Sequence, residues 1–295
     1  MTDFVHLHLH TEYSLLDGAV RLLQVVPDPN DPKKTIKTHP LCDALKARGM
    51  NAVAITDHGN MYGAHTFVSV LRADGIKPII GQEFYVADDM YQKTADVMKK
   101  RYHLILLAKN MTGYKNLMKL SSMAFVDGFY VKPRIDFKHI KEHSEGLICL
   151  SACLAGQIPR LLLEGKYEEA KAVAIEMRDT FAPGDFYIEL QDHHLPEDRI
   201  VMNPLVQIAR EIGVKVVATN DVHYIEKEDA DIQDTMMCIT LGCKKSEING
   251  ARFDTDEFYL KSGDEMVPRS NRDNPRNCGQ SGRRLFHYKT LVDHP

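Results

Sequence analysis

The chain has 295 residues, a formal net charge of −4 and a sequence pI near 6.4. This length fits one large α/β domain or two small ones, and the 44% of hydrophobic residues is enough for a sizeable core. A domain that holds DNA through its phosphates is usually basic, so this composition argues against a simple DNA-binding module. If the protein handles nucleic acid, metal ions or neighbouring domains must supply the positive charge.

The sequence predicts a cytoplasmic protein with no membrane contact. No stretch approaches the roughly 18 consecutive apolar residues of a membrane span. The first residues, MTDFVHLHLHTEYS, lack the basic region followed by an apolar one that marks a secretory signal. The six cysteines form no CxxC pair and no dense framework, which favours reduced thiols.

Short apolar segments alternate with helical ones along the chain. Strands are predicted, in order, over residues 4–10, 52–56, 77–87, 102–108, 147–153, 186–191 and 215–219. Helices are predicted between them over residues 41–48, 61–74, 112–125, 155–164, 167–181 and 196–212. This alternation predicts an α/β fold whose parallel sheet is covered on both sides, either a barrel or an open doubly wound sheet.

Two segments do not fit this alternation. Residues 27–40 hold four prolines and several turn formers, and are predicted to form a loop. Residues 267–295 are basic and show no periodicity, so residues 1–266 are predicted to form the domain and 267–295 a disordered tail. A truncated or frame-shifted gene product would explain such a tail, and a genuine divergent tail is the alternative.

Potential metal ligands follow several predicted strands, whereas no Gly-rich phosphate loop follows any of them. The absence of such a loop disfavours an enzyme with a nucleotide cofactor. In parallel α/β folds the catalytic groups gather at the carboxyl ends of the strands. The residues of ligand type at or near these ends are His8, His10, His58, Glu83, Cys153, Asp221 and His223.

The spacing of two pairs has a physical reason. Residues i and i+2 of a strand point to the same face, so His8 and His10 can share one ion, and Asp221 and His223 have the same spacing. A mixture of imidazoles, carboxylates and one thiolate suits Zn²⁺ or Mn²⁺ better than Ca²⁺ or Mg²⁺. Cys153 taken alone would be a buried apolar side chain.

Other polar residues are predicted to have supporting or surface roles. His6 shares the parity of His8 but is expected to be structural, and Asp57 is expected to cap a helix or to orient a ligand. Neighbours on an extended segment point apart, so His193 and His194 are predicted to lie on the surface. Three cations could meet phosphates but are predicted to be solvated: Lys132, Arg134 and Arg160.

Six motifs occur in an order that resembles a known family. They are HLHLHTEYSLLDG, ITDHGNMYG, KPIIGQEFYVA, YHLILLA, LSAC and ATNDVHY. Together they resemble the PHP (polymerase and histidinol phosphatase) domain at the amino terminus of bacterial DNA polymerase III alpha subunits, over about residues 3–266. FYVKPRID and RFDTDEFYLKSGDEM resemble the alpha subunits more than the small-molecule phosphatases of the family.

The resemblance implies a distorted seven-stranded β/α barrel with three metal ions at the strand ends. It places His8, His10 and Asp221 on one ion, with Glu83 bridging to a second. His103 and Cys153 complete the second ion, and the third is held by Asp17, His58 and His223. His103 opens its apolar run and Asp17 lies in a loop, so only the resemblance nominates these two.

The activity implied by the resemblance is metal-dependent 3′–5′ exonuclease cleavage at a DNA 3′ end. Asp221, His223 and Glu83 would be the catalytic residues. The implied partners are the other polymerase III alpha domains and the proofreading and clamp subunits of the replicase. The polymerase carboxylates belong to later domains, so this chain alone is not expected to polymerise.

Two other functions remain open at this stage. A small-molecule phosphatase of the histidinol-phosphatase type would use the same metals in a tighter, more basic pocket. A non-catalytic scaffold would stabilise the polymerase and dock a proofreading exonuclease subunit. Complete ligands argue against loss of metal, but they do not argue against docking.

Overall fold

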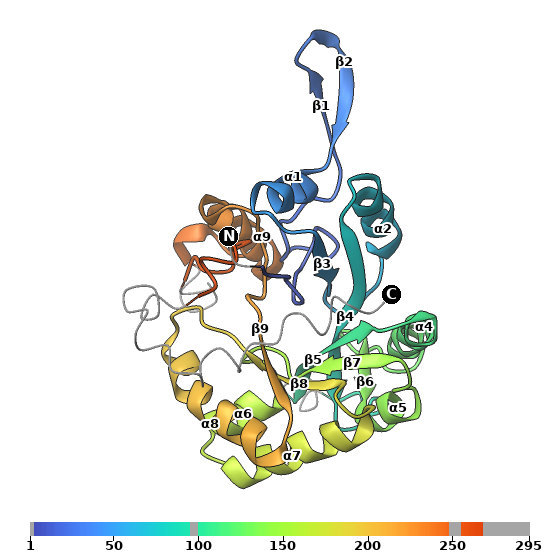
Figure 1. Ribbon diagram of the computed structural model, residues 1–295, viewed down its shortest axis with the longest axis vertical. Helices are drawn as coiled ribbons and strands as arrows, with labels where there is room; N and C mark the ends of the chain where they lie inside the picture. Colours follow the sequence, from blue (N-terminus) through green and yellow to red (C-terminus); the bar gives the residue numbers. More distant parts are fainter. Residues whose placement is uncertain (1–2, 95–99, 248–254, 268–295) are drawn as a thin grey trace.

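The structure is a computed structural model that describes residues 3–94, 100–247 and 255–267. Its main feature is one curled sheet surrounded by helices (Figure 1). The strand order is β3 (Ala52–Ile55), β4 (Lys77–Ala87), β5 (Arg101–Ala108), β7 (Leu147–Leu150), β8 (Phe186–Leu190) and β9 (Lys215–Ala218), and the short β6 (Arg134–Asp136) pairs with β4. The prediction of an α/β fold is confirmed. The sheet has seven strands, as predicted, but β6 is one of them in place of the predicted strand over residues 4–10.

Residues 4–10 join the two ends of this sheet. Their backbone hydrogen-bonds to Ala54 and Thr56 on one side and to Val222, just after β9, on the other. The segment was predicted as a regular strand, but it forms only an isolated bridge between Leu9 and Val222. Its hydrogen bonds alternate between two neighbours and never build a ladder with either one, so a regular strand does not close the barrel here.

The direction of β5 differs from the prediction. β5 runs antiparallel to both β4 and β7, whereas the β3–β4, β4–β6, β7–β8 and β8–β9 pairs are parallel. The prediction of a parallel sheet is therefore wrong for β5. As a result, the amino end of β5 lies at the same edge of the sheet as the carboxyl ends of the parallel strands.

Helices cover the outside of the sheet (Figure 1). They are α1 (Pro40–Ala47), α2 (Ala64–Ala73), α4 (Met111–Val126), α5 (Phe137–Glu142), α6 (Gln157–Leu163), α7 (Tyr167–Thr180), α8 (Pro196–Ile212) and α9 (Ala230–Leu241), with the short turns η1 (Lys227–Asp229) and η2 (Lys245–Glu247). The predicted helices are confirmed with small shifts of their ends, and α8 has the predicted bounds. Gly213 ends α8 with a left-handed φ of 74°, a conformation that glycine adopts without a steric cost.

Alternation of side chains along the strands creates separate inner and outer cores. On β5, Ile105 and Leu107 belong to the cluster inside the barrel, while Leu104 and Leu106 pack outward against the helices. Val5, from the amino-terminal segment, also belongs to the inner cluster. Each fully buried aliphatic side chain contributes about 1.5–3 kcal/mol, so the inner cluster helps to hold the amino-terminal segment in the barrel.

The proline-rich segment is a β-hairpin and not the predicted loop. β1 (Gln24–Asp28) pairs antiparallel with β2 (Asp31–Thr38), and this hairpin, here called the arm, projects from the body (Figure 1). Both strands of a two-stranded hairpin are edge strands. Pro27 can therefore sit in β1 without removing a hydrogen bond that a central strand would need.

Two further predictions concern the ends and the surroundings of the chain. Within the described ranges, every helix is too short or too polar to cross a membrane. The predicted tail, residues 267–295, lies outside the described residues except for Val267. The domain boundary at residue 266 therefore stays a prediction.

Candidate metal centre

The interior face of the barrel is apolar along most of its length and polar at one end. On β5, Ile105 lies in the inner cluster, and His103, two residues earlier, is on the same face of the strand. On β8, Tyr187 lies in the inner cluster, and Glu189, two residues later, is on the same face. Because side chains i and i+2 of a strand point to the same side, these polar residues continue the interior row. The strands therefore direct imidazoles and carboxylates into a common space.

One group of ligand atoms comes from His8, His10 and Asp221. The two Nε2 atoms of the histidines are 3.1 Å apart, and Oδ1 of Asp221 lies 3.0 Å from the first and 3.1 Å from the second. Bonds of about 2.0–2.2 Å to a metal place neighbouring ligand atoms roughly 3.0–3.5 Å apart. The spacing of these three buried side chains therefore fits one shared ion.

Glu83 of β4 lies at the centre of the cluster. Its Oε1 is 2.9 Å from Nδ1 of His103 and 3.4 Å from Nε2 of His8. Its Oε2 contacts Nδ1 of His58 and lies 4.0 Å from Nε2 of His10. A carboxylate whose two oxygens face different imidazoles has the placement that a bridging ligand requires.

Asp17 brings a second carboxylate to the solvent side of the cluster. Its Oδ2 is 3.0 Å from Nε2 of His58, and its Oδ1 is 3.7 Å from Nε2 of His223. His10, His58 and His223 also present ring nitrogens within 4.8 Å of one another. A loop residue that spacing alone could not nominate thus lies among the strand-end histidines.

His103 of β5 contacts Glu83, and Cys153, which follows β7, lies beside His103. The Sγ of Cys153 is 3.8 Å from Nδ1 of His103. His103 opens its strand where a ligand in a parallel sheet would close it, and the antiparallel direction of β5 explains this position. The structure thus brings all nine predicted ligands into one cluster, and their binding of metal stays a prediction.

Two turns beside the cluster adopt left-handed backbone conformations. Ala152, next to Cys153, has φ 65°, and Asp221 has φ 45°. Aspartate tolerates this region better than most residues, whereas for alanine it costs on the order of 1 kcal/mol. The fold accepts this cost at the two positions where the chain turns to present a thiol and a carboxylate.

The cluster keeps its carboxylates ionised. Burial raises the pKa of Glu83, but the rings of His103 and His58 outweigh it and hold the pKa well below its usual range. Burial likewise opposes ionisation of Asp221, and His8 and the other nearby rings hold its pKa well below the usual value. Ionised carboxylates are the form in which these side chains bind metal.

Burial has the opposite consequence for two other groups. It lowers the pKa of His10 to about 3, which keeps this imidazole neutral and able to coordinate. It raises the pKa of the Cys153 thiol well above its usual range. A thiol in this position is deprotonated only when a cation is near.

The remaining polar atoms of the cluster also fit a metal. Oε1 of Glu83 and Oδ1 of Asp221 are buried and make no hydrogen bond of proper geometry within the described part of the chain. A buried carboxylate oxygen without a donor costs about 1–3 kcal/mol or more. Cations between these oxygens and the facing imidazole nitrogens would satisfy both sets of lone pairs.

The sequence interpretation missed Glu189, which lies behind the cluster. Its Oε1 is 2.8 Å from Nδ1 of His8, accepts a hydrogen bond of 3.0 Å from Nε2 of Gln191 and contacts the Thr219 hydroxyl. Its one visible signal is a glutamate inside the apolar strand FYIEL. Gln233 of α9, which donates to Oδ1 of Asp17 at 3.1 Å, gave no signal in the sequence.

Asp57 connects the first loop to the second strand. Its carboxylate accepts hydrogen bonds from the amide and hydroxyl of Thr11 and from the hydroxyl of Ser14, and Ser14 Oγ lies 3.0 Å from Nδ1 of His10. α2 begins after Gly63, so Asp57 does not cap it. Of its two predicted roles, the position of Asp57 fits the orienting of a ligand.

Three further histidines, His6, His193 and His194, were predicted to lie outside the metal centre. His6 is buried and its Nε2 lies 2.8 Å from the carbonyl of Lys261, a position that fits the structural or supporting role predicted for it. His193 was predicted on the surface but is buried, and its Nε2 lies 3.0 Å from the carbonyl oxygen of Asn220. The two neighbours do point apart, and only His194 is exposed.

The three candidate phosphate-binding cations have different surroundings. Arg134 is fully buried and donates to the carbonyls of Gly128, Met90 and Gln92, so its predicted solvation is wrong. Arg160 is half-buried and donates to the carbonyl of Arg101. Lys132 is exposed, as predicted.

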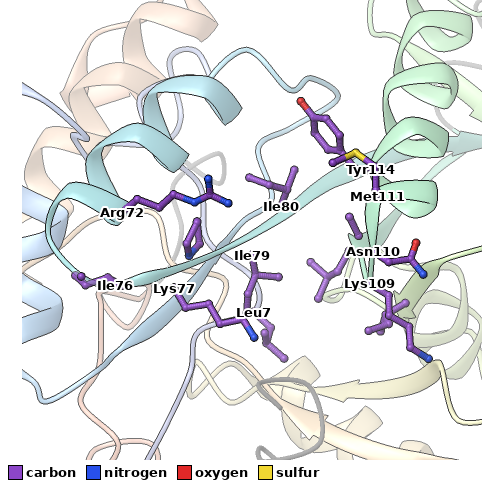
Figure 2. A pocket seen from close by; sticks show the side chains of 15 residues that line it. Leu7, Arg72, Ile76, Lys77, Ile79, Ile80, Lys109, Asn110, Met111 and Tyr114 are labelled. Carbon is purple, nitrogen blue, oxygen red and sulfur yellow. The ribbon is translucent and has the colours of Figure 1, made fainter. Parts of the chain in front are cut away.

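A cavity lies at the opposite end of the barrel. It has a volume of about 610 Å³ and is lined by the start of β4 and the residues that follow β5, among them Lys77 and Lys109 (Figure 2). The ligand cluster lies at the other ends of these strands. This cavity is therefore separate from the candidate metal centre.

The sequence profile of the PHP domain matches residues 33–193, more than half of the chain. The chain belongs to the PHP domain family. This PHP domain is 47% identical over 267 residues to the DNA polymerase III subunit alpha of Treponema pallidum, with 90% of the chain and 22% of the relative covered.

Other relatives carry the same description. The alpha subunit of Borreliella burgdorferi is 45% identical over 265 residues (89% of the chain, 22% of the relative), and that of Thermus aquaticus is 42% identical over 272 residues (89% and 21%). The PHP domain thus spans about a fifth of their length and is homologous to their amino-terminal region. A solved structure from Bifidobacterium adolescentis, named for metal-dependent phosphoesterase activity, is 14% identical with a TM-score of 0.44 and covers 76% of this chain and 88% of its own.

Proposed function

We propose that this PHP domain is a metal-dependent phosphoesterase that acts as a 3′–5′ exonuclease on DNA, as part of a polymerase III alpha subunit. The observation that supports this most strongly is the convergence of nine potential ligands at one end of the barrel. They come from segments as distant in sequence as His8 and His223. Core packing alone does not require imidazoles, carboxylates and a thiol to share one buried space.

The residues present fit three ions of Zn²⁺ or Mn²⁺. His8, His10 and Asp221 would hold one ion, and Glu83 would bridge it to a second. His103 and Cys153 would complete the second site, while the third would be held by Asp17, His58 and His223. Bound metal ions would supply activation of water and stabilisation of the attacking and leaving oxygens.

Asp221, His223 and Glu83 are the residues to which we assign catalytic roles. Nδ1 of His223 lies 2.7 Å from the carbonyl of Asp221, which directs its Nε2 toward the cluster. Asp221 or a neighbouring histidine would accept a proton from the attacking water. Glu83 holds the imidazoles on both of its sides in fixed positions.

The solvent side of the cluster offers positive charge for a phosphate. The side chains of Asp17, His58 and His103 are 23, 16 and 19% exposed, whereas those of His8 and His10 are buried. The ring of Tyr85 packs on His58 and His103 at this side of the cluster. The guanidinium of Arg101 and the ammonium of Lys132 lie 5.7 and 5.6 Å from the centroid of that ring. An acidic chain can thus carry local positive charge where a DNA strand would enter.

Metal analysis combined with DNA digestion tests the proposal. Metal-free protein is loaded with Mn²⁺ or Zn²⁺ and incubated with a labelled primer that carries a mismatched 3′ end. The unsubstituted protein should bind several ions and shorten the primer. The variants His8→Ala and Asp221→Ala should bind less metal and should digest the primer more than about 100-fold more slowly. Removing a ligand should have a larger effect than removing a residue that only orients a ligand, which costs about 10–100-fold in metal affinity or activity. His65→Ala, an exposed histidine on α2, is the matched control.

The possible failures point to different functions. Hydrolysis of an aryl phosphate without digestion of DNA would support a small-molecule phosphatase. Bound metal without any hydrolysis would support a structural centre in a scaffold. A binding assay with a proofreading exonuclease subunit then tests docking, and the same assay with the clamp and the remaining alpha domains tests those partners.

A further inference from the structure

A second group of potential ligands lies outside the barrel, where the arm joins the body. His39 directly follows β2, Cys42 lies in the first turn of α1, and Asp74 caps the end of α2. One ligand atom from each of the three lies within 4.8 Å of the other two. Nδ1 of His39 contacts Oδ2 of Asp74 directly.

We propose that His39, Cys42 and Asp74 form a mononuclear site for a thiophilic divalent cation, with Zn²⁺ as the expected ion and water as the fourth ligand. Imidazole, thiolate and carboxylate are the three protein ligand types that zinc uses. A thiolate and a carboxylate together neutralise a dication. The site is separate from the barrel centre and shares no residue with it.

The surroundings of the three side chains support this assignment. Cys42 is fully buried, whereas the side chains of His39 and Asp74 are 26 and 18% exposed, which leaves a path from solvent for the ion and for a water ligand. Oδ1 of Asp74 contacts Nζ of Lys46. The carboxylate can therefore present Oδ2 to a cation and still keep Oδ1 on the ammonium, an arrangement that orients the ligand.

A metal-free ion-pair cluster is the alternative. It accounts for the contacts of Asp74 with His39 and Lys46 and for a hydrogen bond between the Cys42 thiol and the Asp74 carboxylate, whereas a bound cation would place all three ligand types on one centre. Burial raises the pKa of Cys42 to about 12, so without a cation this thiol stays protonated. Coordination would deprotonate it and would join the root of the arm to α1 and α2 through one centre.

Cobalt binding tests the site without reference to any enzymatic activity. Co²⁺ bound to a thiolate gives a sulfur-to-metal charge-transfer band in the near ultraviolet. The protein carrying Cys153→Ser, which removes the thiol of the barrel, is freed of metal and titrated with Co²⁺. We expect a saturable band with the amplitude of one thiolate, its loss on adding Cys42→Ser, and at least about tenfold weaker binding on adding His39→Ala.

Two outcomes would overturn the proposal: no band in the Cys153→Ser protein, or a band that Cys42→Ser leaves unchanged. His39→Ala alters a partly exposed residue and keeps the test valid if Cys42→Ser fails to fold, with His65→Ala as the exposed-histidine control. Hydrogen exchange gives a local readout. Zn²⁺ should slow exchange of the α1 amides in the wild-type protein and not in Cys42→Ser.

Discussion

Oε1 of Glu189 lies 2.8 Å from Nδ1 of His8, on the ring atom opposite the Nε2 that faces Asp221 and His10. In the neutral ring that would coordinate a metal, the carboxylate favours the tautomer in which Nδ1 donates and Nε2 faces the proposed ion. Because Glu189 contacts the ligand and not the proposed ion, its role is to position His8.

Replacing Glu189 with Gln should weaken metal binding by about 10–100-fold. A neutral amide no longer stabilises the donating Nδ1 of His8, so the ring loses its fixed orientation. Competition with a chromophoric chelator measures the affinity. Glu176→Gln, an exposed glutamate of α7, should leave it unchanged. Equal affinities of Glu189→Gln and wild type would remove this role from Glu189.

Ser14→Ala should disturb the opposite side of the site. Ser14 Oγ donates to Asp57 at 2.8 Å and lies 3.0 Å from Nδ1 of His10. Loss of the hydroxyl leaves a buried carboxylate oxygen and a ring nitrogen without this partner, at a cost of about 1–3 kcal/mol in the free energy of unfolding. Urea unfolding of the metal-free protein measures that cost, with Ser122→Ala on the exposed face of α4 as the control.

His6 should make stability depend on pH below neutrality. Burial lowers the pKa of His6 to about 4 from 6.5. Between pH 6.5 and 4 the unfolded chain binds a proton at His6 that the folded chain does not, so the stability conferred by neutral His6 is complete above pH 6.5 and falls as the pH drops toward 4. The full change approaches about 3 kcal/mol.

His6→Gln isolates this contribution. Glutamine does not titrate, so the variant should show a shallower fall of unfolding free energy between pH 7 and pH 5 than the wild type. Urea melts of metal-free protein at a series of pH values measure both slopes. Parallel slopes would mean that His6 is protonated in the folded state, against its buried position beside the carbonyl of Lys261.

Arg134 should be essential for stability although it was predicted on the surface. Its guanidinium donates to the carbonyls of Gly128, Met90 and Gln92. Arg134→Met keeps much of the volume but leaves these acceptors without a donor, and we expect a loss of more than about 3 kcal/mol. Lys132→Met, two residues away and exposed, should change the unfolding free energy by less than about 0.5 kcal/mol. Thermal or urea unfolding of the pair compares them directly.

Periodicity predicted most helices and strands because an apolar stripe of period 3.6 or 2 is a local property of the sequence. The direction of β5 is not local. It depends on which strands flank β5, and the apolar pattern of YHLILLA is equally compatible with a parallel and an antiparallel strand. For this reason spacing could not nominate His103, whereas His8 and His10, whose ligand geometry depends on their own segment, could be found.

The missed features have related causes. The prolines of residues 27–40 indicated a loop because the sequence does not show that both strands of the arm are edges. Glu189 was read as part of an apolar strand, since a single carboxylate carries no sign of the histidine it meets. His39 and Asp74 are separated by 35 residues and meet only when α1 and α2 pack together.

Residues 4–10 close the barrel with isolated backbone hydrogen bonds to Thr56 and Val222 and without a continuous ladder. This junction, here called the seam, also contains His8 and His10. If the proposed centre binds metal, opening the seam would remove two ligands at once, and binding metal would hold the seam shut. Metal affinity and closure of the barrel would then be two measures of one equilibrium, so a chelator should loosen the amino terminus before any other part of the sheet.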